Sequence, residues 1–344
     1  MRKINWGIVG LGNIAKSFSD GFFDTNRAKL LAISSLNIKK LEKFKNSFDI
    51  NEKYVFKDYE SLLKCHDVDI VYLALPNNLH YKWISEAIKN NKKILVEKPA
   101  LLNFSDAKKI ERKIIDKKLF FTEGYMYRYY PYINEVIELI KKGDIGKPLS
   151  METSFGSNLL TKKKFFFFKK KKKINPDGRL FNLELGGGCI LDLGCYVTSF
   201  SILIASLVVG VNYKNFDLIN VKKKIGSTGV DIDAEGEILF EGGFKSKIKA
   251  SFENDIGNTS IINGENGRVI IRNTWHGRDE IIKIINGKKT IIKNSMTKNI
   301  YSYQIESISE KILENKNETN FLGFKIDDTL LNTKILEEWL NAKK

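Results

Sequence analysis

A glycine-rich turn near the start of the chain constrains the fold more than any other feature of the sequence. The apolar run Ile4–Val9 predicts a buried strand, Gly10-Leu-Gly-Asn-Ile-Ala15 follows it at once, and Ile14–Phe23 has a helical pattern. Strand, glycine turn and helix in this order form the fingerprint of a dinucleotide-binding fold. We therefore predict that the chain opens with a βα unit of a parallel sheet.

Each small residue in this turn has a physical task in that fingerprint. Gly10 permits the tight turn, Gly12 leaves room for a diphosphate, and Ala15 lets helix and strand pack closely. The N-terminus of the helix adds unpaired N–H groups and a partial positive charge for the phosphates. The alternative is an ordinary βα turn that binds no ligand.

Strands and helices continue to alternate over the first third of the sequence. We predict further strands at Leu30–Ser34, Asp69–Ala74, Ile94–Glu97 and Leu119–Glu123, and helices at Lys39–Phe48, Tyr81–Asn90 and Ser105–Lys117. Such alternation predicts a parallel sheet covered by helices on both faces, with ligands bound beyond the carboxyl ends of its strands. Because the alternation ends there, we predict a dinucleotide-binding Rossmann domain over residues 1–123.

Strands dominate residues 124–344. After a helix at Ile133–Lys142, we predict strands at Leu149–Phe155, Ile219–Ile225, Ala234–Phe240, Phe244–Phe252, Thr259–Ile262, Arg268–Arg272, Glu280–Ile285 and Lys289–Ile292. Helices are predicted at Cys189–Leu207, Tyr301–Glu314 and Asp327–Leu340. Glycine turns between successive strands favour a large, mostly antiparallel open sheet. The predicted fold class is α/β, with a Rossmann domain followed by a substrate-binding and dimerisation α+β domain. Its last helix is free to pack back on the first domain.

The chain is basic, with 57 Lys and Arg against 41 Asp and Glu and a formal net charge of +16. A positive charge of this size can favour binding to nucleic acid or to an anionic membrane surface. The sequence is also rich in Lys, Asn, Ile and Phe, as an A/T-rich genome would produce, and we favour this compositional explanation. We therefore predict no nucleic-acid partner and no membrane partner.

Three further features indicate a cytoplasmic location. No stretch approaches the roughly 20 consecutive apolar residues of a membrane span. The first strand begins too early to leave room for a signal peptide. The cysteines Cys65, Cys189 and Cys195 are odd in number and lack metal-ligand spacing, which predicts reduced thiols and no metal site.

The tract Lys162–Lys173 stands apart, because blocks of Lys flank four consecutive Phe residues. This pattern fits neither the period of a helix nor that of a strand. It favours a mobile basic loop. Contact with an anionic partner and a translated A/T homopolymer are the alternatives, and we assign the tract no function.

Four motifs together resemble the Gfo/Idh/MocA family of NAD(P)-dependent oxidoreductases. They are Gly10-Leu-Gly-Asn-Ile-Ala15, Ala74-Leu-Pro-Asn-Asn-Leu-His80, Glu97-Lys-Pro99 and Gly186-Gly-Gly-Cys-Ile-Leu-Asp-Leu-Gly-Cys-Tyr196, and they occur in the family's order. The later stretch Asn263–Arg268 also resembles the family's sheet signature. Within the family, Glu123–Arg128 and Asn175–Phe181 are most similar to the trans-dihydrodiol dehydrogenase-like branch.

The resemblance implies which residues bind the cofactor. Contacts are expected from the glycine turn, the end of the second strand, the loop after the third strand and the Glu-Lys-Pro motif: Gly10, Gly12, Asn13, Ile14, Ser34, Ser35, Leu75, Pro76, Asn77, His80, Glu97 and Lys98. Pro76 and Asn77 are implied to lie near the nicotinamide ribose. We interpret His80 as a loop residue on the cofactor side and not as a catalytic base.

The end of the second strand bears on the choice between NADP and NAD. A carboxylate there would bind the ribose hydroxyls of NAD, and none is present. Ser34 and Ser35 could hydrogen-bond a 2′-phosphate, with Lys39 or Lys40 nearby, although Leu36 replaces the Arg usual in the NADP-using branch. We favour NADP, with NAD as the alternative.

Lys98 follows a parallel strand, where it would face the nicotinamide. A lysine there can hold a substrate hydroxyl by a charge-assisted hydrogen bond, and its charge can favour deprotonation of a nearby acid. The resemblance implies a catalytic and substrate-binding role for Lys98, and Pro99 is often cis in relatives. The alternative is a surface lysine at a strand end.

Asp192 and Tyr196 are four residues apart on a predicted helix, so both should face one side. Tyr196 can transfer a proton if a neighbouring cation lowers its pKa from about 10, and Lys98 is the candidate cation. Asp192 would orient the substrate or Lys98, and glycines 186–188 would let the backbone approach the ligand. The alternative is a helix-capping Asp192 and a Tyr196 packed in the core.

The expected enzyme transfers a hydride between the nicotinamide and a hydroxyl-bearing carbon. The substrate would be a small carbohydrate-like molecule: a sugar, polyol, inositol or cyclic diol. Arg128 is a further candidate for substrate binding, or for an interdomain ion pair. A non-catalytic dinucleotide-sensing regulator is the alternative function, and the family resemblance implies a homodimer through the open face of the sheet.

Overall fold

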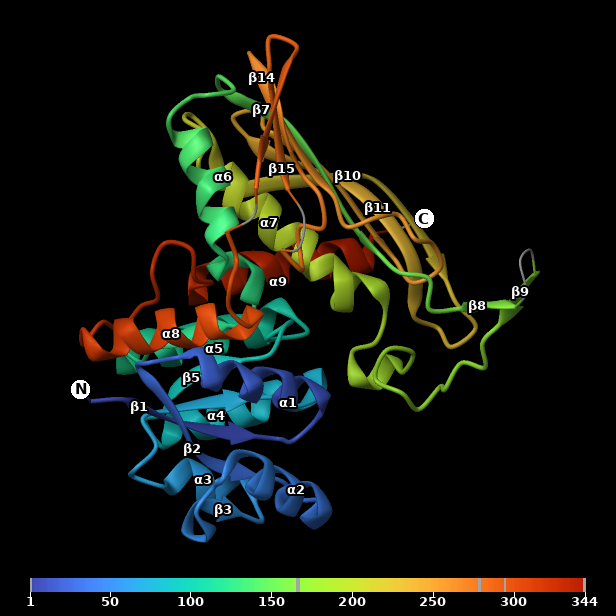
Figure 1. Ribbon diagram of the computed structural model, residues 1–344. Helices are drawn as coiled ribbons and strands as arrows, with labels where there is room; N and C mark the ends of the chain where they lie inside the picture. Colours follow the sequence, from blue (N-terminus) through green and yellow to red (C-terminus); the bar gives the residue numbers. More distant parts are fainter. Residues whose placement is uncertain (1, 165–167, 278–279, 294, 343–344) are drawn as a thin grey trace. The chain divides into compact units, whose positions relative to one another are not determined.

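The chain forms two compact units in its computed structural model (Figure 1), which describes residues 2–164, 168–277, 280–293 and 295–342. The first unit comprises Met1–Tyr130 and Thr297–Leu330, and the second comprises Pro131–Met296 and Leu331–Lys344. Both units take residues from the last fifty of the sequence, so neither is a single continuous run.

The first unit is built on a six-stranded parallel sheet in the order β3-β2-β1-β4-β5-β6. Its strands are β1 (Ile4–Val9), β2 (Ala28–Ser34), β3 (Val55–Phe56), β4 (Ile70–Leu73), β5 (Lys93–Val96) and β6 (Phe121–Glu123). All four residues of β4 are buried, as expected for a parallel strand covered on both faces. The carboxyl ends of β1, β4, β5 and β6 are therefore neighbours at one edge of the sheet.

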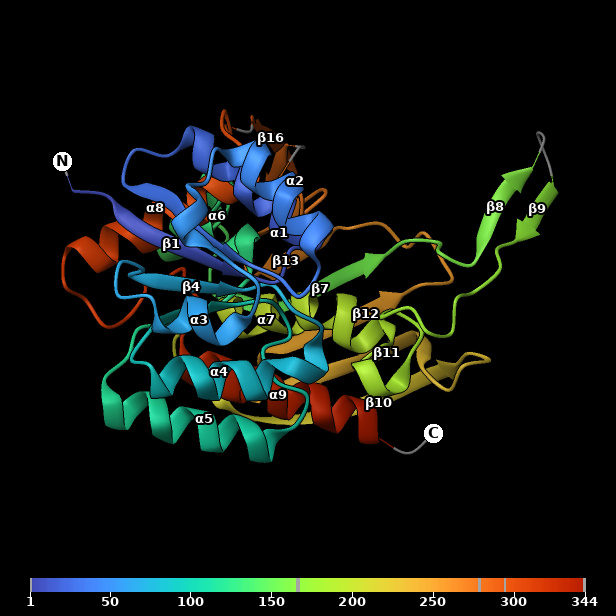
Figure 2. The ribbon, with the colours of Figure 1, turned by 90° about the horizontal axis from the view of Figure 1, so that it is seen from below.

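Helices cover both faces of this sheet. They are α1 (Asn13–Asp20), α2 (Ile38–Phe48), α3 (Tyr59–Lys64), α4 (His80–Lys89), α5 (Phe104–Lys117) and α8 (Ile300–Leu313), with short helical turns η1 (Gly21–Asp24), η2 (Glu52–Tyr54), η3 (Asn77–Leu79) and η4 (Met126–Tyr129). Figure 2 shows α4 and α5 side by side on one face of the sheet, and α1 with α8 on the other. The indole Nε1 of Trp6 donates to Ser309 Oγ at 2.9 Å and so attaches α8 to β1.

Side-chain caps explain where three of these helices begin. Asn37, Asp58 and Asn103 each accept a hydrogen bond from the backbone N–H three residues on. Such caps satisfy N–H groups that have no partner within the helix. The strand β3 and the helix α3 were not predicted, because a two-residue strand and a six-residue helix are too short to show a clear period.

The second unit contains an eight-stranded sheet in the order β10-β11-β12-β7-β13-β14-β15-β16. Its strands are β7 (Pro148–Gly156), β10 (Asn212–Ile225), β11 (Asp231–Glu241), β12 (Lys245–Ser251), β13 (Ser260–Gly264), β14 (Gly267–Ile271), β15 (Ile281–Ile285) and β16 (Lys288–Ile292). Among the described strands of this sheet, only the β12–β7 pair is parallel. The predicted fold class, a Rossmann sheet followed by a mostly antiparallel sheet with helices, is confirmed.

Helices α6 (Pro131–Lys141) and α7 (Cys195–Ala205) lie in the second unit, and α9 (Ile326–Asn341) crosses from the first unit into the second. All eleven residues of α7 are buried. The expectation that no stretch approaches a membrane span was wrong for Leu183–Ala205, which reaches the required length with a mean hydropathy of 1.7. Of its most apolar window 94% is buried inside the protein, so this segment belongs to the core.

Much of the tract Lys162–Lys173 is in strands where the structure describes it. Strands β8 (Thr161–Lys164) and β9 (Phe168–Lys171) pair antiparallel as a separate two-stranded ribbon. Residues 165–167 lie outside the described residues. Paired strands therefore stand where a loop was predicted, because backbone hydrogen bonds in a ribbon do not require an alternating side-chain pattern.

Candidate active site

The glycine turn has the geometry that a phosphate-binding turn requires. Gly10 has a φ of +90°, and a Cβ on it would lie 2.7 Å from the carbonyl oxygen of Ala74, so only glycine fits there. Gly12 is the N-cap of α1, and a Cβ on it would meet no protein atom within 4 Å among the residues described. Asn13 and Ile14 follow, both exposed. The N-terminus of α1 therefore opens onto free space beside Gly12, which fits a diphosphate group.

The end of β2 carries two hydroxyl groups that differ in their hydrogen bonds. Ser34 is fully buried and its hydroxyl donates to Ile8 O at 3.4 Å, while Ser35 Oγ accepts from the N–H of Asn37 at 3.1 Å. Beyond them, Leu36 is 71% exposed. Lys39 and Lys40, in the first turn of α2, are exposed as well. The segment after β2 therefore carries two lysines and the N-terminus of α2, and residues 33–41 include no acid.

The loop after β4 carries four of the predicted cofactor residues. Leu75 is buried, Pro76 is exposed, and Asn77 is half-buried at the start of η3. His80 begins α4 and is completely buried, with Nδ1 2.9 Å from the carbonyl oxygen of Pro99 and Nε2 2.9 Å from that of Leu75. Burial lowers the pKa of His80, and the backbone contacts with Pro99 and Leu75 oppose that shift.

The Glu97-Lys98-Pro99 segment leaves the sheet directly after β5. The Lys98–Pro99 peptide bond is cis. Glu97 is half-buried and accepts a hydrogen bond from the hydroxyl of Tyr72 on the neighbouring strand β4. Lys98 is half-buried too. The structure therefore brings Gly10, Leu75 and Lys98 to the same edge of the sheet, at the ends of adjacent strands β1, β4 and β5.

A carboxylate that we did not predict lies beside this segment. Glu123, at the end of β6, is 2% exposed, and its Oε1 accepts from the N–H of Ala100 at 2.9 Å. Its Oε2 accepts from the hydroxyl of Thr329 at 2.8 Å. Burial raises the pKa of Glu123 to about 7, despite these hydrogen bonds.

Arg128 is buried in the first unit. It is 2% exposed, its Nε donates to Leu322 O at 2.6 Å, and its guanidinium lies 5.0 Å from the ring centroid of Phe324. One terminal nitrogen, Nη1, has no hydrogen-bond partner among the described residues. Substrate binding by Arg128 stays a prediction.

In the second unit, three glycines precede the predicted catalytic pair. Gly186 and Gly188 have φ values of +74° and +113°, and a Cβ on Gly188 would lie 2.4 Å from Oδ1 of Asp231. The chain then forms a π-helical turn, η6 (Ile190–Gly194), which continues into α7. Glycine is therefore required at Gly188, because both its conformation and the close carboxylate exclude a side chain.

Asp231 fixes the start of this helix from β11. It is 4% exposed, and its Oδ2 accepts from the backbone N–H of Ile190 at 2.6 Å. Burial raises the pKa of Asp231, and hydrogen bonds from Ile190 and from the thiol of Cys189 partly oppose that rise. The carboxyl group thus takes the place of an N-terminal cap, on a strand forty residues further along the chain.

Asp192 and Tyr196 lie on consecutive turns of this helix. Oδ1 of Asp192 forms an ion pair with Arg179 at 3.0 Å. Tyr196 is 7% exposed and packs against Phe155 and Trp275, with ring centroids 5.2 and 5.6 Å away. Asp192 sits in the π-helical turn and Tyr196 in α7, so the predicted helical segment is present and its first turn is a π-helix.

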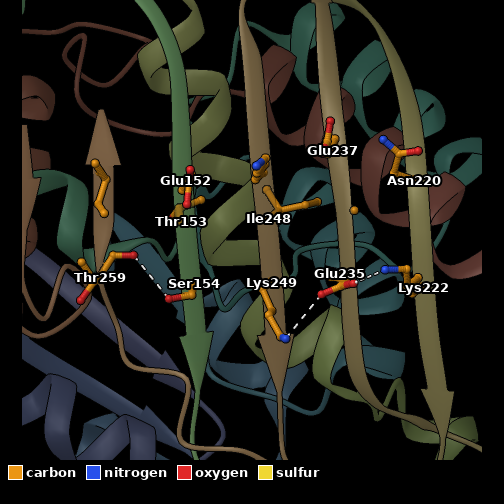
Figure 3. A pocket seen from close by; sticks show the side chains of 13 residues that line it. Glu152, Thr153, Ser154, Asn220, Lys222, Glu235, Glu237, Ile248, Lys249 and Thr259 are labelled. Carbon is orange, nitrogen blue, oxygen red and sulfur yellow. Dashed lines mark hydrogen bonds and ion pairs between the residues drawn. The ribbon is translucent and has the colours of Figure 1, made fainter. Parts of the chain in front are cut away.

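A shallow hollow of about 410 Å³ lies elsewhere, on one face of the large sheet (Figure 3). Charged side chains of neighbouring strands line it, and Glu235 pairs with both Lys222 and Lys249, at 3.0 and 3.4 Å. No predicted site residue lines this hollow. Within the described ranges, no group of three His, Cys, Asp or Glu could hold a metal ion, and the three cysteines form no disulfide.

Sequence reasoning missed Glu123, Asp231 and Arg179 as parts of the site. Glu123 ends an otherwise apolar predicted strand, and a carboxylate in that place was the available signal. Arg179 lies in the stretch that resembles the dihydrodiol dehydrogenase-like branch. Asp231 carried no local signal, because its partners lie about forty residues earlier.

Sequence models of one protein family match both units. The model described as the oxidoreductase family with an NAD-binding Rossmann fold matches residues 4–125. The model of the GFO/IDH/MocA C-terminal domain matches residues 133–270. Together these matches span the glycine turn, Lys98, Asp192 and Tyr196.

Relatives of known function are dehydrogenases and reductases. The chain is 24% identical to the trans-1,2-dihydrobenzene-1,2-diol dehydrogenase of Mus musculus, over 83% of this chain and 79% of that protein. It is 30% identical to the D-xylose 1-dehydrogenase (NADP(+)) of Hypocrea jecorina, over 56% of this chain and 51% of that protein.

Solved structures share the fold over nearly the whole chain. The aldose-aldose oxidoreductase of Caulobacter crescentus, complexed with glycerol, has a TM-score of 0.84 at 22% identity, covering 98% of this chain and 96% of that one. A 3-ketoreductase of Actinomadura kijaniata in complex with NADP has a TM-score of 0.76 at 19% identity, with the same coverage. The chain belongs to the Gfo/Idh/MocA family, and it is an oxidoreductase with an NAD(P)-binding Rossmann domain.

Proposed function

We propose that this enzyme transfers a hydride between a nicotinamide cofactor and a hydroxyl-bearing carbon of a sugar, polyol or cyclic diol. The names of the relatives support this substrate class, since they include diol and xylose dehydrogenases and an aldose oxidoreductase. The single observation that carries the proposal is that the glycine turn and Lys98 follow the carboxyl ends of β1 and β5, two strands of one parallel sheet with only β4 between them in the strand order. Ligands of such sheets bind beyond the carboxyl ends of the strands.

The first unit would hold the cofactor along this edge. Gly10, Gly12, Asn13 and Ile14 would receive the diphosphate, where the free space beside Gly12 fits it. Leu75, Pro76 and Asn77 would contact the nicotinamide ribose, with Glu97 and Lys98 beside the ring. His80 has both ring nitrogens on backbone carbonyls, so any effect of His80 on the cofactor would pass through its two loops.

When bound, the cofactor supplies the hydride acceptor or donor, and the protein handles the proton and the orientation. Lys98 would bind the substrate hydroxyl and lower the pKa of the proton-transfer group. Tyr196 would move the proton, since a neighbouring cation can bring a tyrosine pKa toward neutrality. Asp192, held by Arg179, would orient the substrate or Lys98.

We infer a preference for NADP over NAD at the end of β2. The hydroxyl of Ser34 donates to Ile8 O, which weakens the role that we first gave it, whereas Ser35 Oγ accepts from Asn37 and this contact does not use its O–H donor. Exposed Lys39 and Lys40 on the first turn of α2 are the better candidates for a 2′-phosphate. A carboxylate that would repel this phosphate is absent from residues 33–41.

The open face of the large sheet supports a homodimer as the working assembly. Its charged pairs, such as Lys245 with Glu237 at 3.3 Å, leave a surface whose alternating charges can meet a second copy. Light scattering coupled to size exclusion would give the mass.

Three free thiols support a reducing, cytoplasmic compartment.

Cofactor binding is the first test. Thermal unfolding should be shifted upward by NADPH, and less by NADH, when all four nicotinamide forms are compared. No shift with any form would refute both the enzyme and the dinucleotide-sensing alternative. A panel of aldoses, polyols, inositols and dihydrodiols then tests turnover. Binding without turnover of any of them would favour the non-catalytic sensor.

A further inference from the structure

One peptide group beside Lys98 is held at both ends by buried titratable side chains. The N–H of the Pro99–Ala100 peptide donates to Glu123 Oε1 at 2.9 Å. The carbonyl oxygen of the same peptide lies 2.9 Å from His80 Nδ1. Because a peptide plane is rigid, these two contacts fix the direction in which the chain leaves Lys98.

This contact chain continues in both directions. On one side, His80 Nε2 lies 2.9 Å from the carbonyl oxygen of Leu75, in the loop after β4. On the other, Glu123 Oε2 accepts from Thr329 at the start of α9. The contacts therefore join the loops that follow β4 and β5 to the end of β6, and these three strands are neighbours in the sheet.

Both side chains are sealed from water. His80 is 0% exposed and Glu123 is 2% exposed. A carboxyl oxygen that accepts the Ala100 N–H polarises the peptide and makes its carbonyl oxygen a better acceptor for His80, so the two contacts strengthen each other. Removing either side chain leaves a buried backbone group without a partner.

We propose that His80 and Glu123 are positioning residues that fix Lys98 and the Leu75–Asn77 loop relative to each other. Neither side chain would touch substrate or cofactor. Their task is to join the segment that carries the lysine to the loop that would carry the nicotinamide ribose. This inference rests on the proposed function only in what Lys98 and that loop are for, and the contacts themselves do not depend on it.

The test compares His80→Phe and Glu123→Ala with Glu123→Gln, which keeps an acceptor for Ala100. Two readouts are used: the dissociation constant of NADPH, and the acetylation rate of Lys98 in the protein without cofactor, followed by mass spectrometry. We expect His80→Phe and Glu123→Ala to weaken NADPH binding by about 10-fold and to change the Lys98 rate severalfold, as for a lost hydrogen bond to a buried group. Glu123→Gln should stay within about 3-fold of wild type, as should His66→Phe, a control at an exposed histidine.

The outcomes separate the two levels of the proposal. If wild type does not bind NADPH, the proposed function fails, while the acetylation rates still test the positioning. If Glu123→Ala does not fold, His80→Phe and Glu123→Gln carry the comparison. A folded His80→Phe variant with wild-type NADPH affinity and wild-type Lys98 reactivity would overturn the inference.

Discussion

The two units present their candidate catalytic residues on different kinds of backbone, each with a buried carboxyl group behind it. In the first unit, Lys98 lies in a turn after β5, and Glu123 accepts the N–H of Ala100 two residues later. In the second unit, Asp192 and Tyr196 lie on a helix, and Asp231 accepts the N–H of Ile190 at its start.

The difference follows from what each backbone supplies for itself. A helix satisfies its own backbone groups except at its ends, and the carboxyl group of Asp231 binds one N–H at that end, the N–H of Ile190. A turn has no repeating hydrogen bonds, so both faces of the Pro99–Ala100 peptide need partners. We therefore expect the stability of the first region to depend on the ionisation of Glu123. The stability of the second region should depend on the space beside Gly188.

The largest expected effect tests whether both regions are needed. Lys98→Ala and Tyr196→Phe should each lower kcat by about 10² to 10⁴, the range for loss of positioned acid–base catalysis. Steady-state turnover of the substrate found in the panel is the measurement. Lys64→Ala and Tyr213→Phe are the matched controls, and equal turnover in Tyr196→Phe would remove the second region from the chemistry.

Steric sensitivity in the second region comes next. Gly188→Ala should lower the free energy of unfolding by about 4 kcal/mol, because a left-handed backbone and overlap with Asp231 act together. Gly143→Ala is the matched control, since Gly143 also has a positive φ, of +73°, but no atom of the described residues lies within 4 Å of a Cβ built there. Its loss should be only about 1 kcal/mol. Similar losses in urea unfolding for the two variants would contradict the account of Asp231.

Titration in the first region should show in the pH dependence of stability. The pKa of Glu123 is higher in the folded protein, at about 7, than the ordinary 4.5. Its stabilising effect is thus complete below pH 4.5 and is lost as the pH rises through 7, a change of up to about 3 kcal/mol. Glu97 and Tyr125 face the same carboxyl group and are unchanged in Glu123→Gln.

The measurement is the free energy of unfolding of wild type and Glu123→Gln at pH 4.5 and pH 8. The Gln variant should gain stability relative to wild type between these values. A difference that does not vary with pH would mean that Glu123 does not titrate in this window.

The smallest effect concerns the cofactor alone. Lys39→Ala should weaken NADPH binding about 3-fold to 10-fold and leave NADH binding unchanged, since an exposed charge contributes roughly 1 kcal/mol to a phosphate contact. Fluorescence titration with both cofactors is the measurement. An equal loss for both would place Lys39 away from the 2′-phosphate.

The sequence predicted the turn, strand and helix that carry the candidate residues better than it predicted the side chains that hold those elements in place. These three elements each carry a local signal in the sequence. Gly10 is a turn residue, the strand before Lys98 is an apolar run, and the helix at Tyr196 has a helical period. Glu123, Asp231 and Arg179 act on residues that are distant in sequence, so no local period marks them. The π-helical turn at Asp192 was missed for the same reason, because Asp231, which fixes its start, comes from β11.

A double-mutant cycle tests most directly whether the two regions serve one proton transfer. Turnover is measured for wild type, Lys98→Ala, Tyr196→Phe and the double variant, with the same substrate and NADP. Residues that act as a unit are not additive, so the double variant should be within about 3-fold of the slower single variant. If the two losses multiply instead, Lys98 and Tyr196 act independently, and the shared site that we propose is contradicted.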